Sequence, residues 1–112
     1  MMASVAFAAP GALDTTFGAG TGKVITAIGG GNDNANAMAI QLDGKIVLAG
    51  GCINGASNDF CIARYNADGT LDTTFNTTGK VITPIGTSDD IASSLVIQPD
   101  GKIVIAGYCF NG

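Results

Sequence analysis

Most of this chain consists of short apolar runs that are separated by glycine and aspartate residues. Each run is rich in β-branched or other apolar residues and is bounded by Gly, Asn or Asp; the runs are 22–28, 35–42, 45–52 and 59–65. Such runs predict β-strands joined by turns. Asp43-Gly44 predicts a two-residue hairpin turn, because glycine tolerates the positive φ that such turns require. Residues 53–58 are predicted as a loop.

The same pattern then occurs a second time. Leu13-Asp14-Thr15-Thr16-Phe17 returns as Leu71-Asp72-Thr73-Thr74-Phe75, and Asp43-Gly44-Lys45-Ile46-Val47 returns as Asp100-Gly101-Lys102-Ile103-Val104. The first pair of segments is spaced by 58 residues and the second by 57, so residues 11–112 contain about two repeats of 57–58 residues. A repeat of this length is typical of a sheet unit that buries its apolar faces only against its neighbours. The run Ile46-Val47-Leu48-Ala49 is apolar on both faces of its strand, which indicates burial from both sides.

These features predict an all-β fold of antiparallel meanders, about two blades of a β-propeller, with a β-sandwich-like pair of sheets as the alternative. Residues 11–112 would then contain an outer strand (13–28), a complete blade whose last strand is 71–82, and the two inner strands of the next blade (91–98 and 102–109). The strand equivalent to 59–65 would follow Gly112, so we expect the final blade to be incomplete and the natural chain to be longer.

The repeated motifs resemble the delta-60 repeat. They read Gly-x-Leu-Asp-x-x-Phe, Gly-Lys-Val-x-Thr, Gln-x-Asp-Gly-Lys-Ile-Val-x-Ala-Gly and Asp-Phe-x-x-Ala-Arg-Tyr-Asn-x-Asp-Gly. Asn76 stands where the first copy has Gly18, and Leu42 where the second has Pro99. The resemblance implies a β-propeller blade from tandem arrays in exported bacterial proteins. It transfers no catalytic residue, because the family has none established.

The three cysteines follow the repeat. Cys52 and Cys61 lie on consecutive predicted strands, and a register that pairs them also pairs Gly50 with Ala63. This arrangement permits a cross-strand disulfide that would stabilise the fold by about 2–3 kcal/mol; two buried thiols are the alternative. Cys109 is the repeat equivalent of Cys52, and its partner would lie beyond Gly112.

The composition excludes several classes of function. The chain has 112 residues and a net charge of −4, with nine acidic residues, five basic residues and no histidine. The acidic residues are all Asp, and the basic residues do not cluster, so neither nucleic-acid nor anionic-membrane binding is expected. General acid–base catalysis would fall on Asp or Lys alone, so we expect a protein that is not an enzyme. No cofactor is predicted, since the glycine-rich runs precede no helix.

The positions of the aspartates suggest calcium binding as an alternative function. Asp33, Asp89 and Asp90 lie at predicted loops and could supply oxygen ligands, with solvated turn residues as the competing interpretation. The segment 66–72 resembles part of an EF-hand loop, but Arg64 and Phe75 stand where that loop needs carboxylates. A Ca²⁺-dependent cell-surface protein is therefore our second functional hypothesis.

Residues 1–10 are small and apolar, and Ala6-Phe7-Ala8 resembles a leader cleavage site. We interpret them as the remnant of a secretory leader or as a disordered arm. The leader interpretation predicts a secreted, periplasmic or cell-surface protein. The leading hypothesis is a non-enzymatic structural or binding module that presents loops to a protein or glycan. The contact loops would be 29–34, 53–58, 86–90 and 110–112. Apolar faces and free sheet edges also predict a homo-oligomer or association with the remainder of a longer chain.

Overall fold

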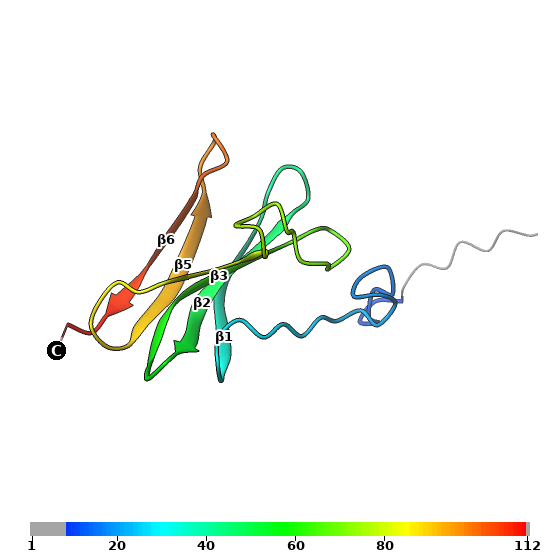
Figure 1. The fold of residues 1–112 in the computed structure, drawn as a ribbon. Helices are drawn as coiled ribbons and strands as arrows, with labels where there is room; N and C mark the ends of the chain where they lie inside the picture. Colours follow the sequence, from blue (N-terminus) through cyan, green and yellow to red (C-terminus); the bar gives the residue numbers. More distant parts are fainter. Residues whose placement is uncertain (1–8, 112) are drawn as a thin grey trace, which may run out of the picture.

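The computed structural model describes residues 9–111, and within this range the protein is built from β-strands and turns without a helix (Figure 1). The first sheet has the order β1-β2-β3-β4 and the second has the order β5-β6, with every pair antiparallel. The six strands are β1 (Asp33–Ile40), β2 (Ile46–Asn54), β3 (Ser57–Tyr65), β4 (Lys80–Thr83), β5 (Asp90–Ile97) and β6 (Ile103–Cys109). The predicted all-β meander is confirmed. The predicted leader, residues 1–8 of it in particular, lies outside the described residues.

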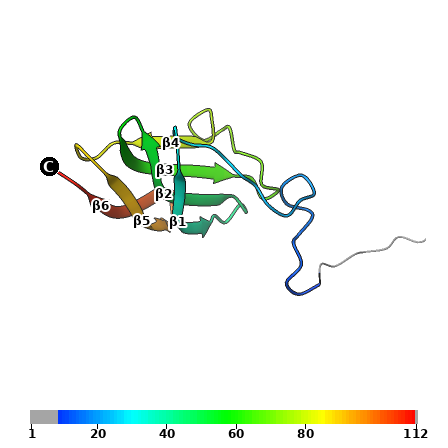
Figure 2. The same cartoon turned by 90° about the horizontal axis from the view of Figure 1, so that it is seen from below.

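The two sheets stack face to face, as successive blades of a propeller do (Figures 1 and 2). Ala49 of β2 and Phe60 of β3 form a buried cluster with Ala92 of β5, and Leu95 and Ile105 pack against this cluster. The two sheets are also internally alike, because the β-bulge of β1, between Ala35 and Ala37, returns in β5 between Ala92 and Ser94. The sequence repeat is therefore a structural repeat.

The hairpin turn after β1 differs from the prediction. Gln41 N donates to Lys45 O (2.8 Å) and Gly44 N donates to Gln41 O (2.9 Å), and only Gly44 has a positive φ, +85°. This is a longer loop ending in a glycine bulge, not a two-residue turn. Asp43 Oδ1 stabilises it by accepting from Lys45 N (3.1 Å). The same backbone bonds recur in the turns 66–70 and 98–102.

The predicted loop 53–58 is instead a tight hairpin. Strands β2 and β3 stay paired up to Asn54 and Ser57, so only Gly55 and Ala56 turn the chain. Gly55 has a φ of +73° and stands at the first central position, where a type II′ turn requires glycine.

The predicted outer strand 13–28, including the run 22–28, is wrong, because no residue of this segment lies in a strand. The loop before it folds as its repeat equivalent does, since Gly22 N donates to Phe17 O (2.8 Å) as Gly79 N donates to Phe75 O (2.7 Å). Residues 22–28 then run extended but are not assigned to a sheet (Figure 2). The equivalent strand β4 pairs with β3, whereas none of the described strands forms a β-ladder with 22–28. Strand β4 is also shorter than the predicted 71–82, because Leu71 makes only an isolated bridge to Tyr65.

Candidate functional site

A buried carboxylate holds together the end of the first sheet that carries the β1–β2 hairpin. Asp72 is 2% exposed. Its Oδ2 accepts from Arg64 Nε (2.7 Å) and lies 2.9 Å from Lys45 Nζ. Its Oδ1 accepts from Thr74 Oγ1 (2.6 Å) and Thr74 N (3.1 Å). Arg64 also lies over the ring of Phe75, 4.6 Å from the ring centroid.

These contacts make Asp72 a structural group. The Thr74 hydroxyl and then the Lys45 ammonium hold the pKa of Asp72 well below its usual range, so the carboxylate stays ionised near neutral pH. Two cationic donors, one hydroxyl and one backbone N–H already occupy its oxygens, which leaves it unsuited to proton transfer. Lys45 is likewise engaged within the fold, because it lies beside Asp72 and also donates to Asn66 Oδ1 (3.1 Å).

The opposite end of the sheets is closed by aspartates that bind backbone N–H groups. Asp33 accepts from Ile28 N (2.7 Å) and Gly29 N (3.0 Å). Its equivalent Asp90 accepts from Ile85 N (2.7 Å) and Gly86 N (2.8 Å), while Asp90 Oδ1 is buried without a hydrogen-bond partner. These carboxylates act as caps for the segments that enter β1 and β5.

Asp89 has a different role from its neighbour. It accepts from Asn58 N (2.8 Å) and Asn58 Nδ2 (3.2 Å), and so ties β3 to the second sheet. This contact holds the pKa of Asp89 below its usual value, chiefly through the Asn58 backbone N–H. Within residues 9–111 no group of three or more Asp, Glu, Cys or His side chains is placed to hold a metal ion. Hydrogen bonding therefore accounts for the carboxylates of Asp33 and Asp89 and for Oδ2 of Asp90.

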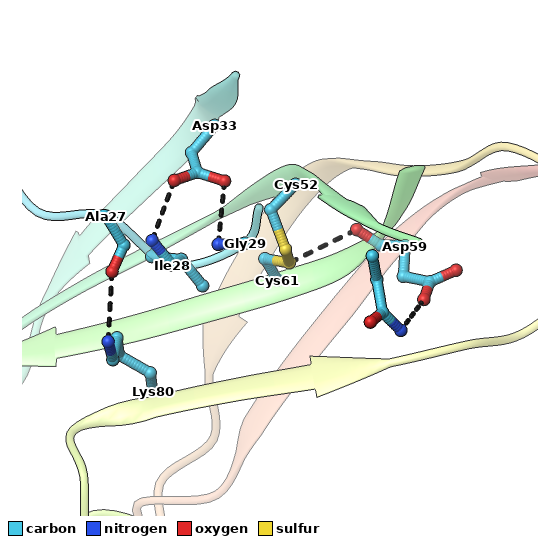
Figure 3. The surroundings of a disulfide bond; sticks show 9 residues. Ala27, Ile28, Gly29, Asp33, Cys52, Asp59, Cys61 and Lys80 are labelled. Atoms are coloured by element: carbon cyan, nitrogen blue, oxygen red, sulfur yellow. Dashed lines mark hydrogen bonds between the residues drawn. A yellow bond between two sulfur atoms is a disulfide. The ribbon is translucent and has the colours of Figure 1, made fainter. Parts of the chain in front are cut away.

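The structure joins Cys52 and Cys61 in a disulfide, with a Cα–Cα distance of 5.9 Å (Figure 3). The predicted register was wrong by two positions, because Cys52 lies opposite Asp59 and Cys61 lies opposite Gly50. The reason is the turn at Gly55, which centres the hairpin earlier than expected. The two sulfur atoms meet diagonally across the strand pair, on the sheet face along which the segment Ala27–Gly29 runs. Cys109 is an exposed free cysteine.

A groove of about 480 Å³ separates the tips of the two equivalent hairpins. Leu42 and Ile40 are exposed there, and Gln41 Oε1 is buried without a partner. The groove is lined by Ile40, Gln41, Leu42, Asp43, Ile97, Gln98, Pro99 and Gly101. A weak signal for this groove is present in the sequence, since apolar Leu42 and Pro99 occupy equivalent positions in otherwise polar turns.

The predicted contact loops lie at the other end of the sheets. Phe110 N donates to Asp89 O (2.9 Å) and Gly30 N donates to Ile53 O (2.8 Å), so these loops are tied to one another in pairs. The carboxylates of Asp33 and Asp89 in these loops also accept N–H groups of the fold. The hairpin-tip groove, lined by 40–43, 97–99 and Gly101, is therefore the better candidate for ligand contact.

Residues 41–75 and 98–112 match the family described as a domain of unknown function (DUF5122) beta-propeller. The two matched segments begin at the equivalent residues Gln41 and Gln98, which agrees with the repeat and supports a β-propeller repeat family. Neither the curated proteins nor the solved structures contain a match to this chain. No helix of the described residues is long and apolar enough to cross a membrane.

Replacing Asp72 tests the buried carboxylate. We expect Asp72→Asn to lower the thermal midpoint at pH 7 by roughly 5–10 °C, because Lys45 and Arg64 lose their anionic partner. The pKa of Asp72 is lower in the folded protein than in the unfolded chain, where it is about 4. The ionised carboxylate therefore stabilises the fold above about pH 4, and this stabilisation is lost as the pH falls. In calorimetric melts, the difference in thermal midpoint between wild type and Asp72→Asn should therefore become smaller as the pH is lowered from about 4 towards about 2.

Asp14→Asn is the matched control for this experiment. Asp14 is the repeat equivalent of Asp72, but it is exposed and accepts only from Thr16. We expect a much smaller change in the midpoint. Equal effects of the two substitutions would show that the cations contribute nothing at Asp72.

The disulfide gives a second prediction. Alkylation of the unreduced, unfolded protein followed by mass spectrometry should label Cys109 alone and leave Cys52 joined to Cys61. Cys52→Ala with Cys61→Ala should lower the free energy of unfolding by about 2–3 kcal/mol, as expected for so short a loop. Cys109→Ala should leave it nearly unchanged. Labelling of all three cysteines would contradict the pairing in solution.

Proposed function

We propose that this protein is a non-catalytic module of an exported β-propeller that binds a protein ligand in the groove between its hairpin tips. The observation that carries the proposal is the groove itself. It is open, has a volume of about 480 Å³, and is formed by equivalent turns of two stacked sheets. Rigid strands position both turns, which is the usual way in which a scaffold presents binding loops.

The chemistry of the lining favours a protein over a glycan. Ile40, Leu42 and Ile97 offer aliphatic surface, and no aromatic side chain lines the groove on which a sugar ring could stack. We infer a ligand that inserts an apolar side chain between the hairpin tips.

The absence of catalysis is part of the proposal. The buried carboxylate Asp72 is saturated with donors, and the capping oxygens of Asp33 and Asp90 already bind backbone N–H groups. The sequence contains no histidine. Export is supported by the Cys52–Cys61 pair, since such bonds persist mainly in oxidising compartments.

Association between copies is the second part of the proposal, and burial supports it. Val47 and Ala49 of β2 are 0% and 1% exposed, because the second sheet covers that face of the first. Their equivalents on β6, Val104 and Ala106, are exposed, with Val104 at 43%. We infer that this outer face of the second sheet packs against another copy of the chain.

The groove is tested by selecting a random phage-displayed peptide library on the wild-type protein. We expect peptides with a shared apolar anchor, whose affinity falls at least about tenfold on Leu42→Asp because a charge enters the apolar site. Ile25→Asp is the matched control, since Ile25 is 98% exposed but lies outside the groove. Peptides that bind Leu42→Asp as well as wild type, or binding to an oligosaccharide array in their place, would refute the proposal.

Association is tested by sedimentation velocity over a range of protein concentrations. Wild type should show a mass that rises with concentration, and Val104→Asp should shift the protein towards monomer, because it places a charge on the outer face. Lys23→Asp changes an exposed residue elsewhere and serves as a control. A wild-type protein that remains monomeric at every concentration would refute association.

A further inference from the structure

One oxygen of the Asp90 carboxylate is buried without a partner. Asp90 is 0% exposed, and the two backbone N–H groups that it caps, those of Ile85 and Gly86, both bind its Oδ2 (2.7 and 2.8 Å). Its Oδ1 is buried and accepts no hydrogen bond from residues 9–111. A buried carboxylate oxygen without a partner destabilises the fold, so a group that binds this oxygen is favoured.

The repeat equivalent Asp33 shows that the fold does not require an unpartnered oxygen. Asp33 divides the same kind of donors between its two oxygens, with Ile28 N on Oδ2 (2.7 Å) and Gly29 N on Oδ1 (3.0 Å). Both donors belong to the segment that enters β1, and neither belongs to β3. The segment that enters β5 is described in full, so a strand pairing with the other edge of β6 is not what Asp90 lacks.

Two further oxygens face the same small space beside Gly86. A Cβ on Gly86 would lie 2.9 Å from both Asp90 Oδ1 and Phe110 O, and 2.8 Å from the side-chain oxygen of Asn111. Phe110 N donates to Asp89 O (2.9 Å). The N–H and C=O of one residue in an extended chain point to the same side, so Phe110 O also faces the segment that enters β5. Glycine at position 86 thus leaves room among three oxygen atoms.

We propose that Asp90 Oδ1, Phe110 O and Asn111 Oδ1 bind a calcium ion beside Gly86. A carboxylate, a backbone carbonyl and a side-chain amide are the kinds of oxygen that Ca²⁺ binds, and water completes its shell of about six to eight ligands. The ion supplies the partner that the buried Asp90 Oδ1 lacks. Asn111 is exposed, so rotation of its side chain admits the ion. Of the aspartates that the sequence suggested for calcium, only Asp90 is a ligand.

Local charge and ligand type both favour calcium. The segment 84–99, which enters and forms β5, contains Asp89 and Asp90 and no Lys or Arg. Mg²⁺ demands near-ideal octahedral geometry and loses its water reluctantly, whereas Ca²⁺ accepts irregular sets of ligands such as this one. Only one carboxylate binds the ion directly, so we expect the modest affinity of extracellular calcium modules, with a Kd of roughly 0.1–1 mM.

Binding is tested by equilibrium dialysis of the full chain against radioactive Ca²⁺. We expect saturable binding of a single ion per chain, and affinity at least about tenfold lower for Asp90→Asn, because the buried ligand loses its charge. Asp33→Asn is the matched control, since both oxygens of Asp33 already accept N–H groups, and it should bind calcium as wild type does. Equal affinities of the two variants, or no saturable binding to wild type, would refute the site.

A second variant, Gly86→Ala, keeps all three ligands and fills the space between them. Calcium at about 10 mM should raise the thermal midpoint of wild type by roughly 5 °C relative to NaCl of equal ionic strength. Gly86→Ala should abolish this rise. Gly29→Ala is the control, because its Cβ would clash with Ile53 O in the first sheet and lower the basal midpoint without touching the site. A rise of wild-type size in Gly86→Ala, or its loss in both variants, would overturn the proposal.

Two further measurements separate this site from other effects. Mg²⁺ at the same concentration should raise the midpoint much less than Ca²⁺ does, and equal rises would show that any divalent cation acts by charge alone and would refute a calcium site. Leu42→Asp changes the hairpin-tip groove at the other end of the sheets and should leave calcium binding unchanged. The calcium site and the groove can therefore fail independently of each other.

Discussion

The packing of the second sheet onto the first is the interaction on which the rest of the structure depends. A strand such as β2 is apolar on both faces, so neither sheet can shield its own residues from water. Small residues at the interface, Ala49, Gly51 and Ala92, allow the two sheets to approach closely. A Cβ on Gly51 would already lie 3.1 Å from the side chain of Ile91. Close packing of this kind fixes how the hairpin tips stand relative to one another, and with them the groove.

The sequence predicted the elements that repetition and periodicity determine. The strand runs 35–42, 45–52 and 59–65 lie within one to a few residues of β1, β2 and β3, because β-branched runs bounded by glycine leave little alternative. The repeat also predicted the partial second sheet. These features depend on the local preference of each segment for a strand and on burial of both strand faces. Both can be inferred from a single sequence.

Turn geometry and register were predicted less well, for a physical reason. The Asp43-Gly44 sequence is compatible both with a two-residue turn and with a loop that ends in a glycine bulge. Only the hydrogen bond from Gln41 N to Lys45 O decides between the two. Likewise, either of two hairpin centres would have placed Cys52 and Cys61 on one face, since side chains alternate with a period of two. The positive φ of Gly55 selects the register that forms. The ion pair of Lys45 with Asp72 joins residues far apart in sequence, and no local pattern could have indicated it.

A repeat sequence therefore does not assign the same role to equivalent residues. Lys45 and Lys102 follow identical turns, yet one lies beside a buried carboxylate and the other beside an exposed one. Cys52 is buried in a disulfide, whereas Cys109 is exposed. The neighbouring strand makes the difference, because β3 supplies the partners on one edge and no described strand supplies them on the other. In this fold the chemistry of a position is set by what pairs with its strand.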